Sequence, residues 1–286
     1  MIGIICDSGT DLPDEILEDK RVKMVPLKVI LGDKIYKDRF EISEEEVLEF
    51  MKQGFPKSSL PNVDEVKNAL MEMVKDGYNE IIGVNISSGL SGTHNVFKMA
   101  SSDFLKEFSD IKIEIVDSLN ISMGAGFLVY KALQLIDSGA SFEEVVRGVK
   151  DSIKKSKLLY TIPTLKFLKA GGRIGKVSAT MGEILNLKPV ISVDDEGVYY
   201  TVAKARGMKK AVDKMTAALV RFAEGRKVLA LSIYRSGNDP KTLELVKTVE
   251  ESLKPLNAPV IFEKSTTPVL LVHVGDGLIG AGVLTE

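Results

Sequence analysis

The stretch of sequence that decides the fold reads EIIGVNISSGLSGT and spans residues 80–93. Its first half is an apolar run rich in β-branched residues, which favours a β-strand. Its second half is a cluster of small hydroxyl residues and glycines, and apolar residues at helical spacing follow from Val96 to Leu105. We therefore expect a strand, a tight polar turn and a helix in direct succession.

A turn of this kind lies at the carboxyl edge of a parallel sheet, where open α/β folds bind their ligands. The first N–H groups of the new helix are unpaired and carry the positive end of the helix dipole, which favours an anion. We predict that this turn binds an acidic head group. The alternative is that Ser91 or Thr93 only caps the helix.

Two further strands end in small polar residues. Met1–Cys6 precedes Asp7–Thr10, and Ile111–Val116 precedes Asp117–Asn120. Strands alternate with helices at least three times over the first 155 residues, which is typical of parallel βαβ units. The three polar turns should then meet at one edge of the sheet.

Local signals place several elements within this first half. Val22–Leu31 is strand-like, and Pro26 inside it predicts an edge position or a bulge. Ser43 with Glu46, and Ser141 with Glu144, have the spacing of a capping box and predict the starts of two helices.

The second half alternates less regularly. Val190–Val193 and Val198–Val202 flank an acidic turn and predict a β-hairpin. Val269–His273 and Leu278–Leu284 are predicted as strands around a turn at Gly275–Gly277. We therefore expect an α/β chain: an N-terminal parallel-sheet α/β/α domain (residues 1–156) and a C-terminal α+β domain with a mixed sheet (residues 157–286).

Composition excludes several classes of protein. The 286 residues carry 38 Lys plus Arg and 40 Asp plus Glu, so no basic excess points to nucleic acid. No apolar segment reaches membrane-spanning length, and Met1–Cys6 enters a strand without a secretory signal. The single cysteine fits a reducing compartment, and one Cys with two His makes a structural zinc site improbable. We expect a cytoplasmic protein without a metal.

Two glycine-rich segments imitate nucleotide motifs. Gly275–Gly280 fits G-x-G-x-x-G, but the residues after it favour a strand and not the helix that receives a pyrophosphate. Gly171–Lys176 has the wrong spacing for a phosphate loop, and Val177 replaces the Ser or Thr that would hold Mg²⁺. We interpret the first as a hairpin turn and the second as a joint that carries a functional arginine.

A hydrolase is the main catalytic alternative. Ser91 or Ser59 could pair with His273 and with Asp7 or Asp117. Thr93 stands where the G-x-S-x-G elbow needs its last glycine, and no spacing supports a triad.

Six segments in order along the chain resemble the DegV family of bacterial fatty-acid-binding proteins. They are DSGTDLP (7–13), KSSLP (57–61), SSGLSGT (87–93), VDS (116–118), LKFLKAGGRI (165–174) and HVG (273–275). Each is weak alone, and together they are specific.

The resemblance implies a two-domain α/β protein that buries one long-chain fatty acid, such as palmitate, and needs no cofactor. It implies that hydroxyl groups hold the carboxylate, with a histidine and two basic residues nearby. The residues carried over are Ser58, Ser59, Ser87, Ser88, Ser91, Thr93, Arg173, Arg206 and His273.

The resemblance also implies a partner, a separate fatty acid kinase subunit related to dihydroxyacetone kinases, to which the bound acid is presented. Our leading hypothesis is a non-catalytic fatty-acid carrier. The alternatives are a serine esterase or thioesterase using Ser91 and His273, and a binding module for a small phosphorylated metabolite.

Overall fold

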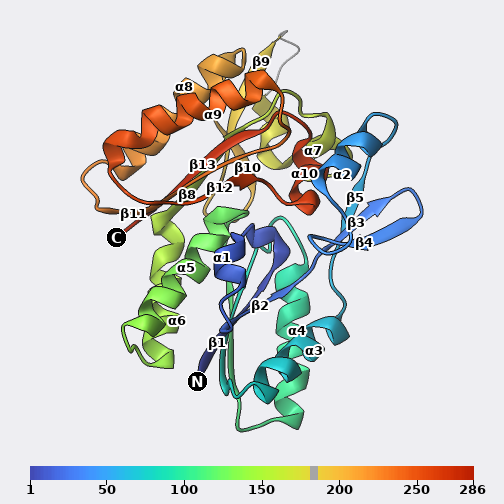
Figure 1. Ribbon diagram of the computed structural model, residues 1–286, viewed down its shortest axis with the longest axis vertical. Coiled ribbons are helices and arrows are strands. Elements are labelled where there is room, and N and C mark those ends of the chain that lie inside the picture. The colour runs from blue at the N-terminus through green and yellow to red at the C-terminus, as the bar shows by residue number, and fades with distance from the viewer. Residues whose placement is uncertain (181–185) are drawn as a thin grey trace.

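The computed structural model describes residues 1–180 and 186–286 and begins with a parallel sheet (Figure 1). Its strand order is β2-β1-β6-β7, and all pairs are parallel. The strands are β1 (Ile2–Asp7), β2 (Val22–Val25), β6 (Glu80–Asn85) and β7 (Lys112–Asp117). The predicted strand of residues 80–86 is thus a central strand of this sheet.

Helices cover both faces of the parallel sheet. One face packs on α3 (Val63–Lys75) and α4 (Thr93–Glu107) through a core that includes Ile81 and Phe97. The other packs on α5 (Met123–Asp137), whose neighbour is α6 (Phe142–Ser152). This is the α/β/α arrangement expected from the alternating pattern.

The predicted strand Val22–Leu31 is two strands in two sheets. β2 ends at Val25, directly before Pro26, and β2 is an edge strand as expected for a segment that runs into proline. The chain then enters a three-stranded antiparallel sheet of order β4-β3-β5. Its strands are β3 (Lys28–Leu31), β4 (Lys34–Lys37) and β5 (Lys57–Ser59), with α2 (Glu44–Met51) between β4 and β5.

The second half contains a six-stranded mixed sheet of order β10-β9-β8-β13-β11-β12. Its strands are β8 (Ser156–Thr161), β9 (Leu187–Val193), β10 (Tyr199–Arg206), β11 (Val228–Arg235), β12 (Val260–Ser265) and β13 (Ile279–Thr285). β11 and β12 are parallel and the other pairs are antiparallel. The predicted hairpin is formed by β9 and β10.

One face of the mixed sheet packs on α8 (Met208–Ala223) and α9 (Pro240–Leu253), and the other faces the first half of the chain (Figure 1). The remaining helices are short. They are α1 (Asp14–Leu17), α7 (Lys166–Ala170), α10 (Pro268–Val274) and 3₁₀ turns at Ser8–Thr10, Ile153–Lys155, Gly175–Thr180 and Lys254–Leu256.

The strand predicted at Val269–His273 is wrong: these residues lie in the helix α10. Pro268 stands in its first turn, where a missing N–H costs nothing. Two buried carboxylates accept hydrogen bonds from the N–H groups on either side of Pro268. Thr267 N donates to Oδ1 of Asp11 at 2.9 Å, and Val269 N donates to Oδ1 of Asp38 at 3.0 Å. Because these partners come from the far end of the chain, local sequence could not reveal the helix start.

The hairpin turn predicted at Gly275–Gly277 is also wrong, because the turn joins α10 to β13. Gly275 ends the helix at φ +74°, a conformation that favours glycine. No helix follows the G-x-G-x-x-G segment, since β13 begins at Ile279.

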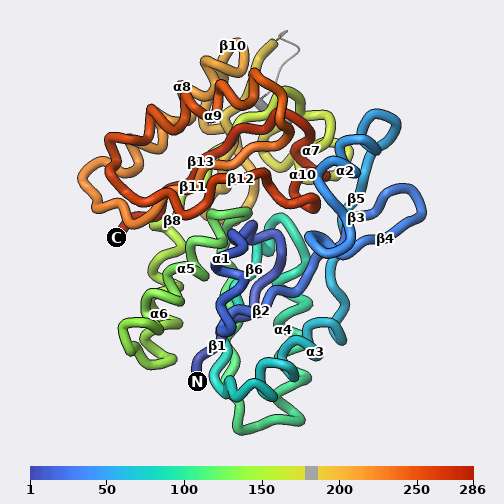
Figure 2. Tube along the Cα trace, in the orientation of Figure 1, coloured from blue at the N-terminus to red at the C-terminus, as the bar shows by residue number. Residues whose placement is uncertain are grey.

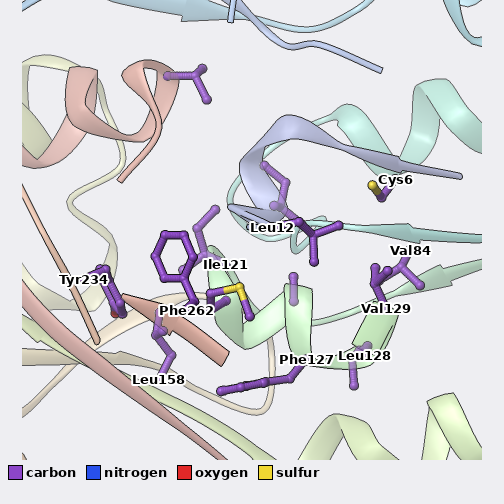
Figure 3. Packing of buried hydrophobic residues seen from close by; sticks show 14 of the residues in the cluster. Cys6, Leu12, Val84, Ile121, Phe127, Leu128, Val129, Leu158, Tyr234 and Phe262 are labelled. Carbon is purple, nitrogen blue, oxygen red and sulfur yellow. The ribbon is translucent and has the colours of Figure 1, made fainter. Parts of the chain in front are cut away.

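The main hydrophobic core contains residues of both sheets, among them Ile82 of β6 and Leu158 of β8. The backbone trace in Figure 2 shows the two halves of the chain lying against each other. Figure 3 shows Cys6 and Val84 at one end of this core and Leu158 and Tyr234 at the other. The predicted boundary falls on Ser156, the first residue of β8. The division into two domains stays a prediction, since one core serves both sheets.

Candidate ligand-binding site

A cavity of about 310 Å³ lies between the two halves of the chain. Its size is at the lower end of the range for small-molecule sites, roughly 300–1,000 Å³. Five of the predicted site residues line it, and most of its other lining residues are apolar or aromatic. The five are Ser58, Ser59, Ser91, Arg173 and His273.

The polar end of the cavity is organised around His273. Its Nε2 lies 2.7 Å from the Oγ of Ser58, although the two residues are 215 positions apart. Ser58 comes from the short strand β5 and His273 from the last turn of α10. The contact therefore needs the three-stranded sheet of the first half to lie beside the last helix.

The segment after α7 fixes the surroundings of the His273 ring. A Cβ on Gly171 would lie 2.5 Å from Nδ1 of His273, so only glycine fits without moving the ring. The carbonyl of Gly171 accepts a hydrogen bond from Arg173 Nη1 at 2.6 Å. The glycine-rich segment predicted as a joint therefore contacts both the ring of His273 and the side chain of Arg173 through Gly171.

His273 is neutral at physiological pH. Burial lowers its pKa to about 4, and the positive charge of Arg173 adds to this effect. Within the described residues, Nδ1 of His273 has no hydrogen-bond partner. In the described structure the neutral ring therefore forms its hydrogen bond through Nε2, and this bond positions the Ser58 hydroxyl.

Ser91 reaches the same cavity from the turn after β6. Its Oγ lies 2.8 Å from the Oγ1 of Thr93, and it accepts a weaker bond from Thr93 N at 3.3 Å. The N-cap residue of α4 is Gly92, which has no side chain with which to cap the helix. The alternative in which Ser91 or Thr93 caps the helix therefore accounts for only part of this geometry.

Four predicted residues do not line the cavity, as far as the structure describes the chain. Ser87 is buried and donates to the carbonyl of Gly197 at 2.8 Å, which fastens the turn to the β9–β10 hairpin. Ser88 and Arg206 are exposed, and Thr93 is buried behind Ser91. The side chain of Thr93 is hydrogen-bonded to Ser91, which lines the cavity.

The two hydrolase candidates are not paired with each other in the described structure. His273 contacts Ser58, whereas Ser91 contacts Thr93. Asp7 accepts bonds from Gly9 N and Ile86 N, so it is occupied in stabilising the first polar turn. Asp117 accepts from Ser88 N and Leu119 N in the turn after β7. Among the described residues, Nδ1 of His273, which the acid of a triad would bond, has no partner.

Sequence reasoning missed a buried polar network behind the cavity. Ser122 and Thr266 both line the cavity, and both donate to Oδ2 of Asp11, at 2.6 and 2.9 Å. Burial raises the pKa of Asp11. Asp11 lies within the DSGTDLP segment, but its partners are over 100 residues away, so the motif alone gave no sign of the network.

Two further features bear on the class of protein. Within residues 1–180 and 186–286, no cluster of three or more His, Cys, Asp or Glu side chains is arranged to hold a metal ion. None of the helices in the described part of the chain combines the length and apolar character that a bilayer crossing requires.

Comparison with known proteins assigns the family. A model of the DegV family of uncharacterised proteins matches residues 1–286. The chain belongs to the DegV family. A DegV domain-containing protein of Clostridium acetobutylicum is 36% identical over 285 residues, which cover 100% of this chain and 99% of that protein.

Solved DegV structures share this fold. A fatty-acid-binding DegV family protein from Thermus thermophilus is 30% identical and matches with a TM-score of 0.90, covering 100% of this chain and 99% of that one. The Fatty Acid Kinase (Fak) B3 protein of Streptococcus pneumoniae, loaded with linoleic acid, is 26% identical at a TM-score of 0.85, with 100% of both chains covered. The predicted family and fold class are confirmed, and DegV relatives bind fatty acids.

Proposed function

We propose that this DegV protein is a non-catalytic carrier that binds one long-chain fatty acid, such as palmitate, in the cavity. The observation that carries the proposal is the division of one cavity into a polar and an apolar end. Ser58 and His273 contact each other in the cavity wall, Ser91 lines the same cavity, and Arg173 adds a positive charge. The fatty-acid-binding relatives support the same ligand class.

The energetics suit a fatty acid. Burial of a long acyl chain at about 0.8 kcal/mol per methylene gives a gross gain on the order of 10 kcal/mol. Neutral hydroxyl bonds add only about 1 kcal/mol each. The tail then supplies most of the affinity, and the hydroxyls orient the carboxyl group, whose burial without partners would be costly.

We further propose that the carrier presents the acid to a separate fatty acid kinase subunit, related to dihydroxyacetone kinases, which phosphorylates the carboxyl group. The Fak B3 relative supports such a partner. A carrier of this kind needs no catalytic triad of its own, in keeping with the separate contacts of Ser91 and His273.

Native mass spectrometry of the purified protein, with extraction and identification of any bound lipid, tests the carrier proposal. We expect one fatty acid per chain, and weaker retention of palmitate in Ser91→Ala at unchanged melting temperature. Ser88→Ala is the matched control, because Ser88 is an exposed serine of the same turn. A protein that is free of lipid and ignores added palmitate would contradict the proposal.

The esterase alternative is tested on the same variants with p-nitrophenyl palmitate. Turnover that disappears in Ser91→Ala would favour a hydrolase over a carrier. The kinase step is tested by adding a purified fatty acid kinase subunit with ATP, where acyl phosphate should form only when the carrier is present.

A further inference from the structure

Three neighbouring strands of the mixed sheet place two tyrosines and a glycine in one row. Gly280 of β13 is paired with Tyr160 of β8 on one side and with Tyr234 of β11 on the other. The residues flanking Gly280, Ile279 and Ala281, belong to the core under α8 and α9. Because side chains alternate along a strand, position 280 faces the cavity.

Gly280 allows the ring of Tyr234 to lie flat on the sheet. A Cβ at position 280 would lie 2.2 Å from both Cε2 and Cζ of Tyr234, and 2.6 Å from its hydroxyl oxygen. The Tyr234 hydroxyl crosses β13 and donates to the carbonyl of Leu159 at 3.3 Å. With any side chain at 280, the ring must leave this position.

Tyr234 belongs to the apolar part of the cavity wall. Leu158 and Ile121 line the cavity with it, and Figure 3 shows these three residues gathered in one region with Phe262. Its hydroxyl is engaged by the Leu159 carbonyl and not by Ser58 or His273. Since the sheet lies on one side of the ring, the free direction for its movement is into the cavity.

We infer that Gly280 and Tyr234 together set the length of acyl chain that the cavity accepts. The flat ring leaves room for the terminal methylenes, and a raised ring would remove it. This inference rests on the proposed fatty-acid ligand and names the residues that select among fatty acids. The carboxyl end of the ligand takes no part in the selection.

The test is a chain-length series of myristate, palmitate, stearate and arachidate, with affinities measured on delipidated protein. In Gly280→Ala the preference for stearate over myristate should fall about tenfold, because each buried methylene contributes about fourfold and room for about two is lost. In Tyr234→Leu the relative affinity for arachidate should rise. The double variant Gly280→Ala/Tyr234→Leu should regain the stearate preference, since the displaced ring is gone.

Gly282→Ala is the matched control. It adds a methyl group to the same strand, but that Cβ would clash with Ser232 and Phe127, which are not among the described residues that line the cavity. It would meet the cavity-lining Leu158 only at 3.5 Å, an ordinary van der Waals contact. It should lower the melting temperature without changing the chain-length preference. If Gly280→Ala weakens all four acids equally, or if Tyr234→Leu fails to restore the double variant, the inference is overturned.

This result is separable from a failure of the proposed function. If the wild-type protein binds none of the four acids, the carrier proposal fails. If it binds them and Gly280→Ala keeps the wild-type preference, the carrier proposal stands and the role of Gly280 is refuted. Should Gly280→Ala not fold, Tyr234→Leu alone decides, because a wild-type preference in that variant also refutes the inference.

Discussion

The two ends of the cavity are built in different ways. The polar end takes Ser58 from a short strand, Ser91 from a turn and His273 from a seven-residue helix, so it depends on irregular segments that meet only in three dimensions. The apolar end takes Leu158 from β8 and Tyr234 from β11, where strand alternation faces both side chains inward. The first end depends on contacts between segments far apart in the sequence, and the second on the alternation of a regular sheet together with the contact of Gly280 and Tyr234.

The largest expected effect tests whether the apolar end supplies the affinity. Octanoate has eight methylenes fewer than palmitate, and at about 0.8 kcal/mol for each it should bind roughly 10⁴- to 10⁵-fold more weakly. Isothermal titration or competition with a fluorescent fatty acid measures the difference. Similar affinities for the two acids would place the binding energy at the polar end and reverse the comparison.

The second prediction concerns how the polar end is held. Asp38 supports α10, the helix that carries His273, by accepting from Val269 N. Burial, helped by the nearby charge of Asp11, raises the pKa of Asp38 to about 7. Hydrogen bonds from Ser8 and Val269 N and the charge of Arg39 oppose this rise. The folded protein thus retains a proton that the unfolded chain releases near pH 4, so this contribution to stability is full below pH 4 and is lost as the pH rises towards 7.

Between pH 5 and pH 8 the wild type should therefore lose about 2 kcal/mol of unfolding free energy that Asp38→Asn does not lose. Urea unfolding at the two pH values measures this difference. Asp33→Asn, at an exposed position in the β3–β4 turn, is the control and should follow the wild type. Parallel pH profiles for wild type and Asp38→Asn would refute the prediction.

The third prediction separates orientation from affinity at the polar end. His273→Ala removes the partner of Ser58 Oγ and should weaken palmitate binding about tenfold, as expected for one or two hydrogen bonds. Hexadecanol, which has the same tail without the carboxylate, should lose less. His94→Ala is a suitable control, because His94 lies in α4 and outside the described lining of the cavity. If His273→Ala weakened the binding of palmitate and hexadecanol equally, the histidine would support the cavity wall without contributing to recognition of the carboxylate.

The smallest expected effect is that of Ser59→Ala. Ser59 lines the cavity, but its side chain is more exposed than that of Ser58, so water competes for its hydrogen bonds. We expect palmitate to bind about two- to threefold more weakly, at unchanged melting temperature. If Ser59→Ala weakened palmitate binding as much as His273→Ala does, Ser59 would be a main ligand of the carboxyl group and the prediction would be wrong.

Much of the fold could be predicted from local patterns. The β6 strand, the polar turn after it and α4 follow directly from residues 80–105, and the capping boxes at Ser43 and Ser141 form as their spacing predicts. Such signals depend on neighbours within four residues, so the sequence alone contains them. The DegV motifs also placed Ser58, Ser91 and His273 in one predicted site, although no local rule connects them.

What only the tertiary structure decided are the contacts between distant segments. The helix at Pro268–Val274 begins where Asp11 and Asp38 accept its free N–H groups, and an apolar run that predicts a strand becomes a helix for that reason. The same holds for the flat ring of Tyr234, which depends on a glycine of the neighbouring strand. Sequence patterns report what each residue prefers beside its chain neighbours, whereas burial and hydrogen bonding between remote residues determine which preference prevails.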